Sequence, residues 1–444
     1  MKRILVSVLV LCAFYSCKNN EDYKTFLHDP VLYSATVHEL NDVVMGNNFP
    51  PMVASRNYAY AAVAGYEVIA VGFPKKYNSL AGQLNEMKAM PKPDTTKPID
   101  YYLAALLSYI KVGEAVTFPE GSMKAYTDSI MKIARKKGLP SDVEKASHEF
   151  ADSIANAVIR WSKGDNYAQT RGAEKYTVID TPGRWVPTPP MYAQAMEPHW
   201  KEIRPMVLDS ANQFKWPLPY DFNIKDKNSL YYKEVLMSKG RTDSLSEEQA
   251  WIADFWDDNP FKLNVAGHLM FATKKISPAG HWMNIIGIAA QKANYNFDET
   301  VYAFAETSIA FFDAFIECWW AKYVYNTARP ETVIDKYMDA NWRPHLQTPP
   351  FPEYTCGHCT ISAAAAETLT KTFGDNFSYT DTSELEFGIK SRSFTSFRQA
   401  ADETRMSRFY GGIHFLYSTE RGRNVGMEIG NYIAQKLKMR KEEH

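Results

Sequence analysis

The chain has 444 residues, enough for one large helical domain or for two to three smaller domains. Its 50 basic and 51 acidic residues leave a net charge of −1, so no overall field favours nucleic acid or an anionic membrane surface as a partner. Aromatic residues make up 14% of the chain, which excludes a disordered protein and predicts a densely packed core.

The N-terminus has the pattern of an export signal. Lys2 and Arg3 precede an apolar run that is too short to span a membrane and that ends in Phe-Tyr-Ser before Cys17. This end resembles a bacterial lipoprotein processing site, so we predict a signal peptide over residues 1–17 and a lipid anchor on Cys17. The protein would then be exported and tethered in the periplasm or at the outer membrane. The alternative is an ordinary cleaved signal with an incidental cysteine.

Helical periodicity dominates the rest of the chain, and a loop rich in proline and lysine at 88–98 interrupts it. The predicted helices cover residues 30–45, 54–70, 99–116, 120–137, 141–163, 231–237, 246–256, 284–294, 298–329, 360–373 and 384–405. Alternating apolar runs between hairpin turns are absent from the sequence, so the predicted fold class is all-α, a large helical bundle.

Residues 165–226 break the helical pattern with a segment rich in glycine, proline and tryptophan. Its aromatic content is too high for a flexible linker, so we predict an ordered segment that wraps across the helical body. The predicted organisation is an N-terminal helical region, 18–240, that includes this wrap, followed by a C-terminal helical catalytic domain, 241–444.

The predicted helix 298–329 carries basic residues on a strongly aromatic background. Lys322 and Arg329 are seven positions apart, which is two helical turns, so the pattern predicts that they project from one face, with Trp319 one turn earlier. The alternative is a solvated basic face. Because the surrounding residues are so apolar, we favour a buried anion-binding role.

A turn at 351–362 is the second candidate feature. Prolines hold its approach extended, Gly357 permits close backbone approach, and a strong helix follows His358. The first amides of a helix are unpaired and the peptide dipoles direct positive charge outward, so this turn is predicted to attract an anion.

Arg408 and His414 form the third feature. They are six residues apart, so a single straight helix would separate them, and Gly411 and Gly412 must form a turn if the two are to converge. An arginine fork suits an oxyanion, and a neutral imidazole can act as a nucleophile or a metal ligand. A core histidine and a surface arginine are the alternative.

Together these features resemble the vanadium-dependent haloperoxidases and their relatives, the type-2 phosphatidic acid phosphatases and bacterial acid phosphatases. The family pattern is Lys-x6-Arg-Pro, then Pro-Ser-Gly-His, then Ser-Arg-x5-His. The chain matches it with Lys322 to Pro330, with residues 355–358 and with Ser407 to His414. The helical segments outside these motifs are similar to those of the bacterial haloperoxidase branch, especially its iodide-oxidising members.

The resemblance implies a site and a reaction. His414 would be the axial ligand of vanadium, His358 the acid–base group for peroxide, and Trp319 and Phe351 the halide side of the pocket. The expected ligands of the vanadate oxygens are Lys322, Arg329, Cys356, Gly357 and Arg408. The substrates would be hydrogen peroxide and a halide, with iodide the first choice. No nucleic acid partner is expected, the membrane would be contacted only through the lipid anchor, and a homodimer is possible.

Two positions depart from the family pattern. Cys356 replaces the usual serine and is a weaker hydrogen-bond donor that oxidants can attack. Ser418 stands where an aspartate often follows the last histidine, so the group that orients His414 is missing or comes from elsewhere. A phosphatase with His414 as nucleophile and His358 as acid is the main alternative, and the loss of the aspartate favours the peroxidase.

Other readings of single motifs also remain. Cys356-Gly-His-Cys359 matches a thiol–disulfide redox motif, although no βαβ pattern surrounds it, and the two cysteines could form a disulfide. Cys318 is predicted to be a buried filler. The aromatic wrap could instead bind a ligand in a non-enzymatic lipoprotein. We expect His281 to lie at a helix entry and to pack or hydrogen-bond near the pocket. Asp254, Asp257 and Asp258 are expected to cap or solvate a loop rather than to bind a cation.

Overall fold

The computed structural model describes residues 22–260, 262–266, 269–272 and 276–441. The predicted signal peptide and Cys17 lie outside these residues. Within the described part of the chain, no helix combines the length and the hydrophobicity needed to cross a membrane.

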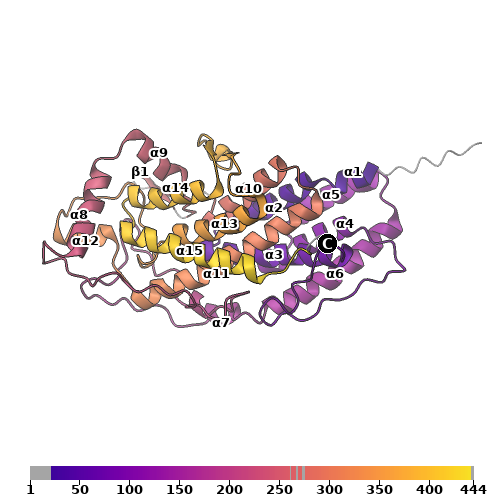
Figure 1. Ribbon diagram of the computed structural model, residues 1–444, viewed down its shortest axis with the longest axis horizontal. Coiled ribbons are helices and arrows are strands. Elements are labelled where there is room, and N and C mark those ends of the chain that lie inside the picture. Colours follow the sequence, from indigo (N-terminus) through magenta and orange to yellow (C-terminus); the bar gives the residue numbers. More distant parts are fainter. Residues whose placement is uncertain (1–21, 261, 267–268, 273–275, 442–444) are drawn as a thin grey trace, which may run out of the picture.

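The fold is all-α, as predicted, and forms an elongated body (Figure 1). The first helices are α1 (Asp22–Leu27), α2 (Pro30–Gly46), α3 (Pro51–Gly72), α4 (Tyr101–Val116), α5 (Lys124–Lys136), α6 (Ser141–Ser162) and α7 (Tyr167–Arg171). After the 3-10 turn η1 (Trp200–Glu202) follow α8 (Leu230–Asp243), α9 (Glu247–Phe255), α10 (Pro278–Lys292), α11 (Phe297–Tyr325), α12 (Pro330–Tyr337), α13 (Gly357–Phe373), α14 (Phe397–Tyr410) and α15 (Leu416–Lys436). The predicted list omitted α1, α7, α12 and α15.

Two short antiparallel hairpins depart from the helical prediction. One pairs β1 (Leu263–Ala266) with β2 (Leu269–Ala272), and the other pairs β3 (Tyr379–Asp381) with β4 (Arg392–Phe394). With the 3-10 turn η2 (Leu385–Phe387), the second hairpin occupies much of the predicted helix 384–405, so its first half was wrong. Tyr379 and Phe394 pair across this hairpin and are both buried, which stabilises extended backbone there.

The predicted helix 298–329 ends early, at Tyr325. Asn326 adopts a left-handed conformation with φ 49° and caps the helix by donating its N–H to the Lys322 carbonyl. Arg329 is extended, as expected for a residue before proline, and precedes α12. The prediction that Lys322 and Arg329 share one helical face was therefore wrong, because a bend separates them.

Helix α11 is the centre of the molecule. It packs against α3, α13 and α15. Nearly all of its side chains are buried, which agrees with its aromatic sequence. One hydrophobic core runs from Tyr23 to Met439 and takes residues from both sides of position 240. The predicted domain boundary at 240/241 stays a prediction.

A row of glycines brings α15 close to α13. Gly422, Gly426 and Gly430 recur every four residues and so lie on one face of α15. An added Cβ at these positions would meet backbone oxygens of α13 and its cap, namely those of Cys356, Thr360 and Ala364. Only glycine permits this approach, which fixes the start of α13 against α15.

Residues 165–226 lie across α11, held by its buried carboxylates. Asp313 accepts hydrogen bonds from the backbone N–H groups of Met206, Val207 and Leu208 at 2.7, 2.8 and 2.9 Å. One turn later, Glu317 accepts one from the N–H of Phe214 at 2.7 Å. Apart from α7 and η1, this segment is coil, and these side-chain-to-backbone bonds hold it against α11.

Replacement of Asp313 by alanine should strongly destabilise the protein. It leaves three buried N–H groups without their acceptor, and each such loss costs about 1–3 kcal/mol. We therefore expect the free energy of unfolding to fall by about 3 kcal/mol or more, measured by urea denaturation. Asp152→Ala, on the surface of α6, is the control with little change. Equal midpoints for the two variants would contradict this anchoring role.

Candidate active site

The three predicted motifs meet around one small cavity. Its volume is about 40 Å³, and its walls come from α11, the turn at 349–351, the start of α13, and the end of α14 with the turn after it. The predicted residues that line it are Trp319, Phe351, Gly357, His358, Arg408 and His414. Lys322 lies directly behind Gly357, with its Cε 3.9 Å from where a Gly357 Cβ would be. The glycine turn predicted between Arg408 and His414 is present, with Gly412 at φ 72°.

The start of α13 directs a helix N-terminus at this cavity. Cys356 is the N-cap, and Gly357 and His358 are the first two helical residues, so α13 begins three residues earlier than predicted. The N–H of Cys359 points back to Cys356 Sγ at 3.3 Å. The unpaired first amides of a helix add positive potential on the side that faces the cavity.

The two arginines are fully buried, and each keeps a free donor. Arg329 donates from Nε to the Phe351 carbonyl at 2.9 Å and from Nη1 to the Ile413 carbonyl at 2.8 Å. Arg408 donates from Nη1 to the carbonyls of Trp256 and Asp257 at 2.5 and 3.1 Å. Among the described residues, Arg329 Nη2 and Arg408 Nε have no hydrogen-bond partner.

The electrostatic balance of the cavity is strongly positive. Burial lowers the pKa of Arg329 to about 9 and also lowers the pKa of Arg408, because a buried cation is costly without an anion. Asp257 lies 3.9 Å from Arg408 and offsets part of its charge. Asp257 and Asp258 are buried here, so neither solvates a loop, which was one of their two predicted roles.

Lys322 contacts the loop before α13 rather than facing the cavity directly. Its ammonium group donates to the carbonyls of Pro352, Glu353 and Thr355 at 3.1, 3.1 and 2.5 Å. Burial lowers its pKa, and the charge of Arg329 acts in the same direction. Lys322 thus fixes the approach to Gly357, and its predicted contact with an oxyanion stays a prediction.

His414 is held in a defined tautomer. Arg329 Nη1 donates to His414 Nε2 at 3.0 Å, so Nε2 carries the lone pair and Nδ1 carries the proton. That proton is donated to Glu353 Oε1 at 2.7 Å. Burial, followed by the charges of Arg329 and Lys322, lowers the pKa of His414 well below its ordinary value. The ring is therefore neutral, and its basic nitrogen Nε2 accepts from Arg329, a hydrogen bond that a ligand of Nε2 would have to displace.

Glu353 is the functional residue that the sequence analysis missed. It replaces the orienting group expected at position 418, because its carboxylate holds His414 and also accepts from the N–H of Phe415 at 3.2 Å. Burial raises its pKa, whereas Arg329, the Ser418 hydroxyl and Lys322 lower it. Its signal in the sequence is that it is the one charged residue between Pro349 and His358.

His358 lies on the cavity wall and is also neutral. Burial, and to a smaller extent the charge of Arg408, lowers the pKa of His358 well below its ordinary value. A hydrogen bond to the Asp257 backbone raises the pKa but does not offset this. His358 Nε2 has no hydrogen-bond partner among the described residues. Arg408 Nε, also unpaired, belongs to the same cavity wall, and Arg329, with its unpaired Nη2, bonds the lining residues Phe351 and His414 from behind. Unpaired buried donors of this kind suit a tetrahedral oxyanion.

Comparison with known proteins identifies the family. Residues 302–442 match the model of the VCPO second helical-bundle domain. The crystal structure of the first bacterial vanadium-dependent iodoperoxidase is similar over 94% of this chain and 98% of that chain, with 43% sequence identity and a TM-score of 0.88. The chain belongs to the vanadium-dependent haloperoxidase family. Its cofactor is therefore vanadate, which suits the buried cationic cavity and the neutral His414 in its wall.

More distant family members share the fold. The holo-type and apo-type structures of a bacterial vanadium-dependent chloroperoxidase are 15% and 14% identical to this haloperoxidase, each with a TM-score of 0.64. The matches cover 88% and 87% of this chain and 93% and 94% of those chains. No curated protein matches the sequence.

One wall of the haloperoxidase cavity is apolar. The rings of Trp319 and Phe351 lie 5.0 Å apart, and Phe315 packs against Trp319 at 5.5 Å. All three line the cavity. This places the two residues predicted for the halide side together, and their role toward a halide stays a prediction.

Cys356 and Cys359 form a disulfide across the first turn of α13, and both are buried. An exchange reaction needs an accessible sulfur, and coil rather than a strand precedes the motif, so the thiol–disulfide oxidoreductase alternative is disfavoured. The pairing also removes the Cys356 thiol as a hydrogen-bond donor. Cys318 is buried, as predicted.

Breaking this disulfide should make the enzyme sensitive to its own oxidant. Cys359→Ser frees the Cys356 thiol, which peroxide can oxidise beside the oxyanion site. We expect faster loss of activity during incubation with hydrogen peroxide, together with a gain of oxygen at Cys356 by mass spectrometry. The matched control is the double variant with serine at both positions, which has no thiol there and should keep its activity. Equal inactivation rates would refute this protective role.

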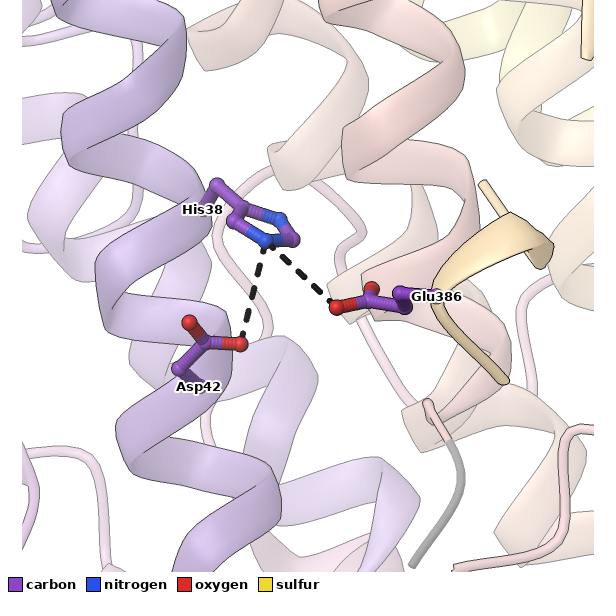
Figure 2. A group of neighbouring side chains, drawn as sticks. All are labelled: His38, Asp42 and Glu386. Carbon is purple, nitrogen blue, oxygen red and sulfur yellow. Dashed lines mark ion pairs between the residues drawn. The ribbon is translucent and has the colours of Figure 1, made fainter. Parts of the chain in front are cut away.

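A separate group of metal-ligating side chains lies on the surface. His38 Nε2 is 3.8 Å from both Asp42 Oδ1 and Glu386 Oε2 (Figure 2), and none of the three lines the cavity. Their side chains are 41%, 46% and 40% exposed. Solvated carboxylates beside a histidine are common surface ion pairs, so we assign no cation to this group.

Proposed function

We propose that the protein uses vanadate and hydrogen peroxide to oxidise a halide, iodide in particular, to the hypohalous acid. The observation that carries the proposal is the 43% identity to a bacterial vanadium-dependent iodoperoxidase over 94% of the chain. The site agrees with it, because His414 is a neutral imidazole in the cavity wall, with its Nδ1 proton held by Glu353 and its Nε2 accepting from Arg329. A ligand to a metal oxyanion needs this tautomer, and its second nitrogen needs such a partner.

The other side chains at the cavity would each have a separate role in the reaction. When bound, vanadate supplies a Lewis-acidic centre that activates peroxide toward the halide. Arg329 and Arg408 offset the negative charge of the oxyanion through charge-assisted hydrogen bonds. The oxidation of iodide by hydrogen peroxide consumes one proton and releases hypoiodous acid and water. His358, whose Nε2 is unpaired in the cavity wall, would accept a peroxide proton and return it to the departing oxygen.

Iodide is the halide that the apolar wall favours. It is the largest and least strongly hydrated of the common halides, so leaving water for the Trp319 and Phe351 surface costs it least. The similarity to a bacterial iodoperoxidase at 43% identity supports the same choice.

A phosphatase remains a defined second candidate, because of Glu353. The missing aspartate at position 418 argued against His414 as a nucleophile, but Glu353 supplies the orienting carboxylate at 2.7 Å. The same tautomer that suits a vanadium ligand also suits attack on phosphorus. The family assignment, rather than the local geometry, therefore decides for the peroxidase.

One assay separates the two activities. The purified protein, loaded with vanadate and given peroxide and iodide, should form triiodide in proportion to bound vanadate, and bromide and chloride should react more slowly. Phosphate ester hydrolysis by the vanadate-free protein, without any triiodide from the loaded protein, would overturn the peroxidase assignment. Equal rates with chloride would overturn the preference for iodide.

We infer from the sequence that the protein is exported and tethered by a lipid on Cys17. The basic start, the short apolar run and the processing-site pattern support this location. Expression of Cys17→Ser should move the protein from the membrane fraction to the soluble exported fraction. An unchanged membrane fraction would refute the anchor.

Sedimentation of the tag-free protein tests whether it forms the possible homodimer.

A further inference from the structure

A buried histidine with carboxylate partners lies behind the oxyanion cavity. His281, in the first turn of α10, is fully buried, with Nδ1 3.0 Å from Asp258 Oδ1 and Nε2 2.8 Å from Asp381 Oδ2. Glu384 Oε1 lies 3.7 Å from the same Nδ1. Each ring nitrogen thus faces a carboxylate oxygen, an arrangement that an imidazolium satisfies with two N–H donors.

The charge state follows from these partners. Burial lowers the pKa of His281, but the charges of Asp258 and Asp381 and their hydrogen bonds raise it well above its ordinary value overall. The pKa of Asp381 is lowered by the same pairing, against the effect of burial. Asp258, His281 and Glu384 are near enough to surround a cation. However, both ring nitrogens of His281 donate to carboxylates, so the ring has no lone pair left to bind a cation.

The partner of His281 belongs to a turn that holds two cavity residues. Arg408 donates to the carbonyls of Trp256 and Asp257, and His358 hydrogen-bonds to the Asp257 backbone. The Trp256 ring stacks on His281, with centroids 4.7 Å apart and planes 23° from parallel. His281 therefore contacts one side of turn 256–258. The backbone carbonyls on the other side of the turn accept from Arg408 and bond His358.

The conformation of this turn needs such support. Asp258 has φ 41°, in the left-handed region, which aspartate adopts more readily than most residues but still much less often than the right-handed region. A residue in that region persists when its surroundings fix it. The bond from His281 fixes the Asp258 side chain, and Asp381 in turn fixes the other side of the His281 ring.

We propose that His281 is a positioning residue of the active site, which acts through Asp258 and the backbone of turn 256–258 to hold Arg408 and His358 toward the bound oxyanion. The proposal rests on the proposed function in one respect, namely that the cavity binds vanadate. It explains why a protonated histidine is buried at the N-terminus of α10, where the helix dipole disfavours a cation.

The test is vanadate binding by the full chain without peroxide or halide. We expect His281→Gln to raise the dissociation constant at least tenfold by isothermal titration calorimetry. In ¹⁵N-histidine spectra, the His358 ring signal, assigned with His358→Gln, should also shift, which a purely stabilising role would not cause. His28→Gln is the matched control, because His28 also bonds a carboxylate, that of Asp100 at 2.8 Å, but does not line the cavity.

A second variant keeps the test decisive if His281→Gln does not fold. Asparagine tolerates the left-handed conformation, so Asp258→Asn keeps the turn while it removes the charge that His281 holds. We expect weaker vanadate binding and a shifted His358 signal in this variant too. Parental affinity and an unmoved His358 signal in the folded variants would overturn the proposal. Failure of the parental protein to bind vanadate would instead overturn the proposed function.

Discussion

Replacement of His414 by alanine is expected to abolish halide oxidation and to leave the helical fold intact. The variant loses the one uncharged nitrogen base whose lone pair is oriented by both Glu353 and Arg329. The remaining cations can still attract vanadate, but without a covalent ligand they should hold it weakly. Triiodide formation should fall to the rate measured without protein, and calorimetry should show weaker vanadate binding.

The control for this variant is His199→Ala. His199 also bonds a carboxylate, that of Glu202 at 2.9 Å, and lies outside the cavity, so its loss should leave activity unchanged. Circular dichroism and thermal unfolding of both variants separate a loss of function from a loss of fold. Full activity in a folded His414→Ala protein would show that the site is elsewhere.

Glu353→Gln is expected to lower the peroxidase rate by about 10–100-fold, the range seen when the partner of a metal-bound histidine is lost. Glutamine keeps the shape of the side chain but not its charge. Its amide can also present N–H to His414, which would force the proton from Nδ1 to Nε2 and remove the lone pair from the cavity. In addition, the buried cations Lys322 and Arg329 lose a neighbouring anion.

Glu331→Gln is the matched control for the loss of a buried carboxylate. Glu331 is 3% exposed and accepts a hydrogen bond from Thr348 at 2.6 Å, without contact to His414. Both variants should change stability, but Glu353→Gln alone should change the rate per bound vanadate. Equal rates per bound vanadate in the two variants would mean that Glu353 does not set the state of His414.

The sequence predicted the regions of the site that short spacing determines. The glycine turn between Arg408 and His414 depends on neighbouring residues, so local chemistry was sufficient, whereas the helix predicted from residue 360 begins three residues earlier, at Gly357. The prediction that Lys322 and Arg329 share one helical face was also wrong for a local reason. Asn326 ends the helix in a left-handed cap, which hydrophobic periodicity cannot show. The two side chains still converge on the Phe351 ring, with Lys322 Nζ 5.0 Å and the Arg329 guanidinium carbon 4.9 Å from its centroid.

What the sequence could not show are contacts between distant segments. Glu353 and His414 are 61 residues apart, and His281 reaches Asp381 across 100 residues. A carboxylate in a loop has no periodic signature, and its partner is known only after the helices have packed. The β3–β4 hairpin was missed for the same reason, since its pairing of Tyr379 with Phe394 lies in a segment with helical composition.

The glycine row of α15 has a consequence for how the enzyme loses activity. Gly422 leaves no space between α15 and the carbonyl of Cys356, the residue that begins the oxyanion-facing end of α13. That end therefore cannot loosen on its own, because any outward motion must first separate α13 from α15 in the central core. Heat should accordingly inactivate the enzyme in a single cooperative step, with vanadate release and the loss of helical structure at the same temperature.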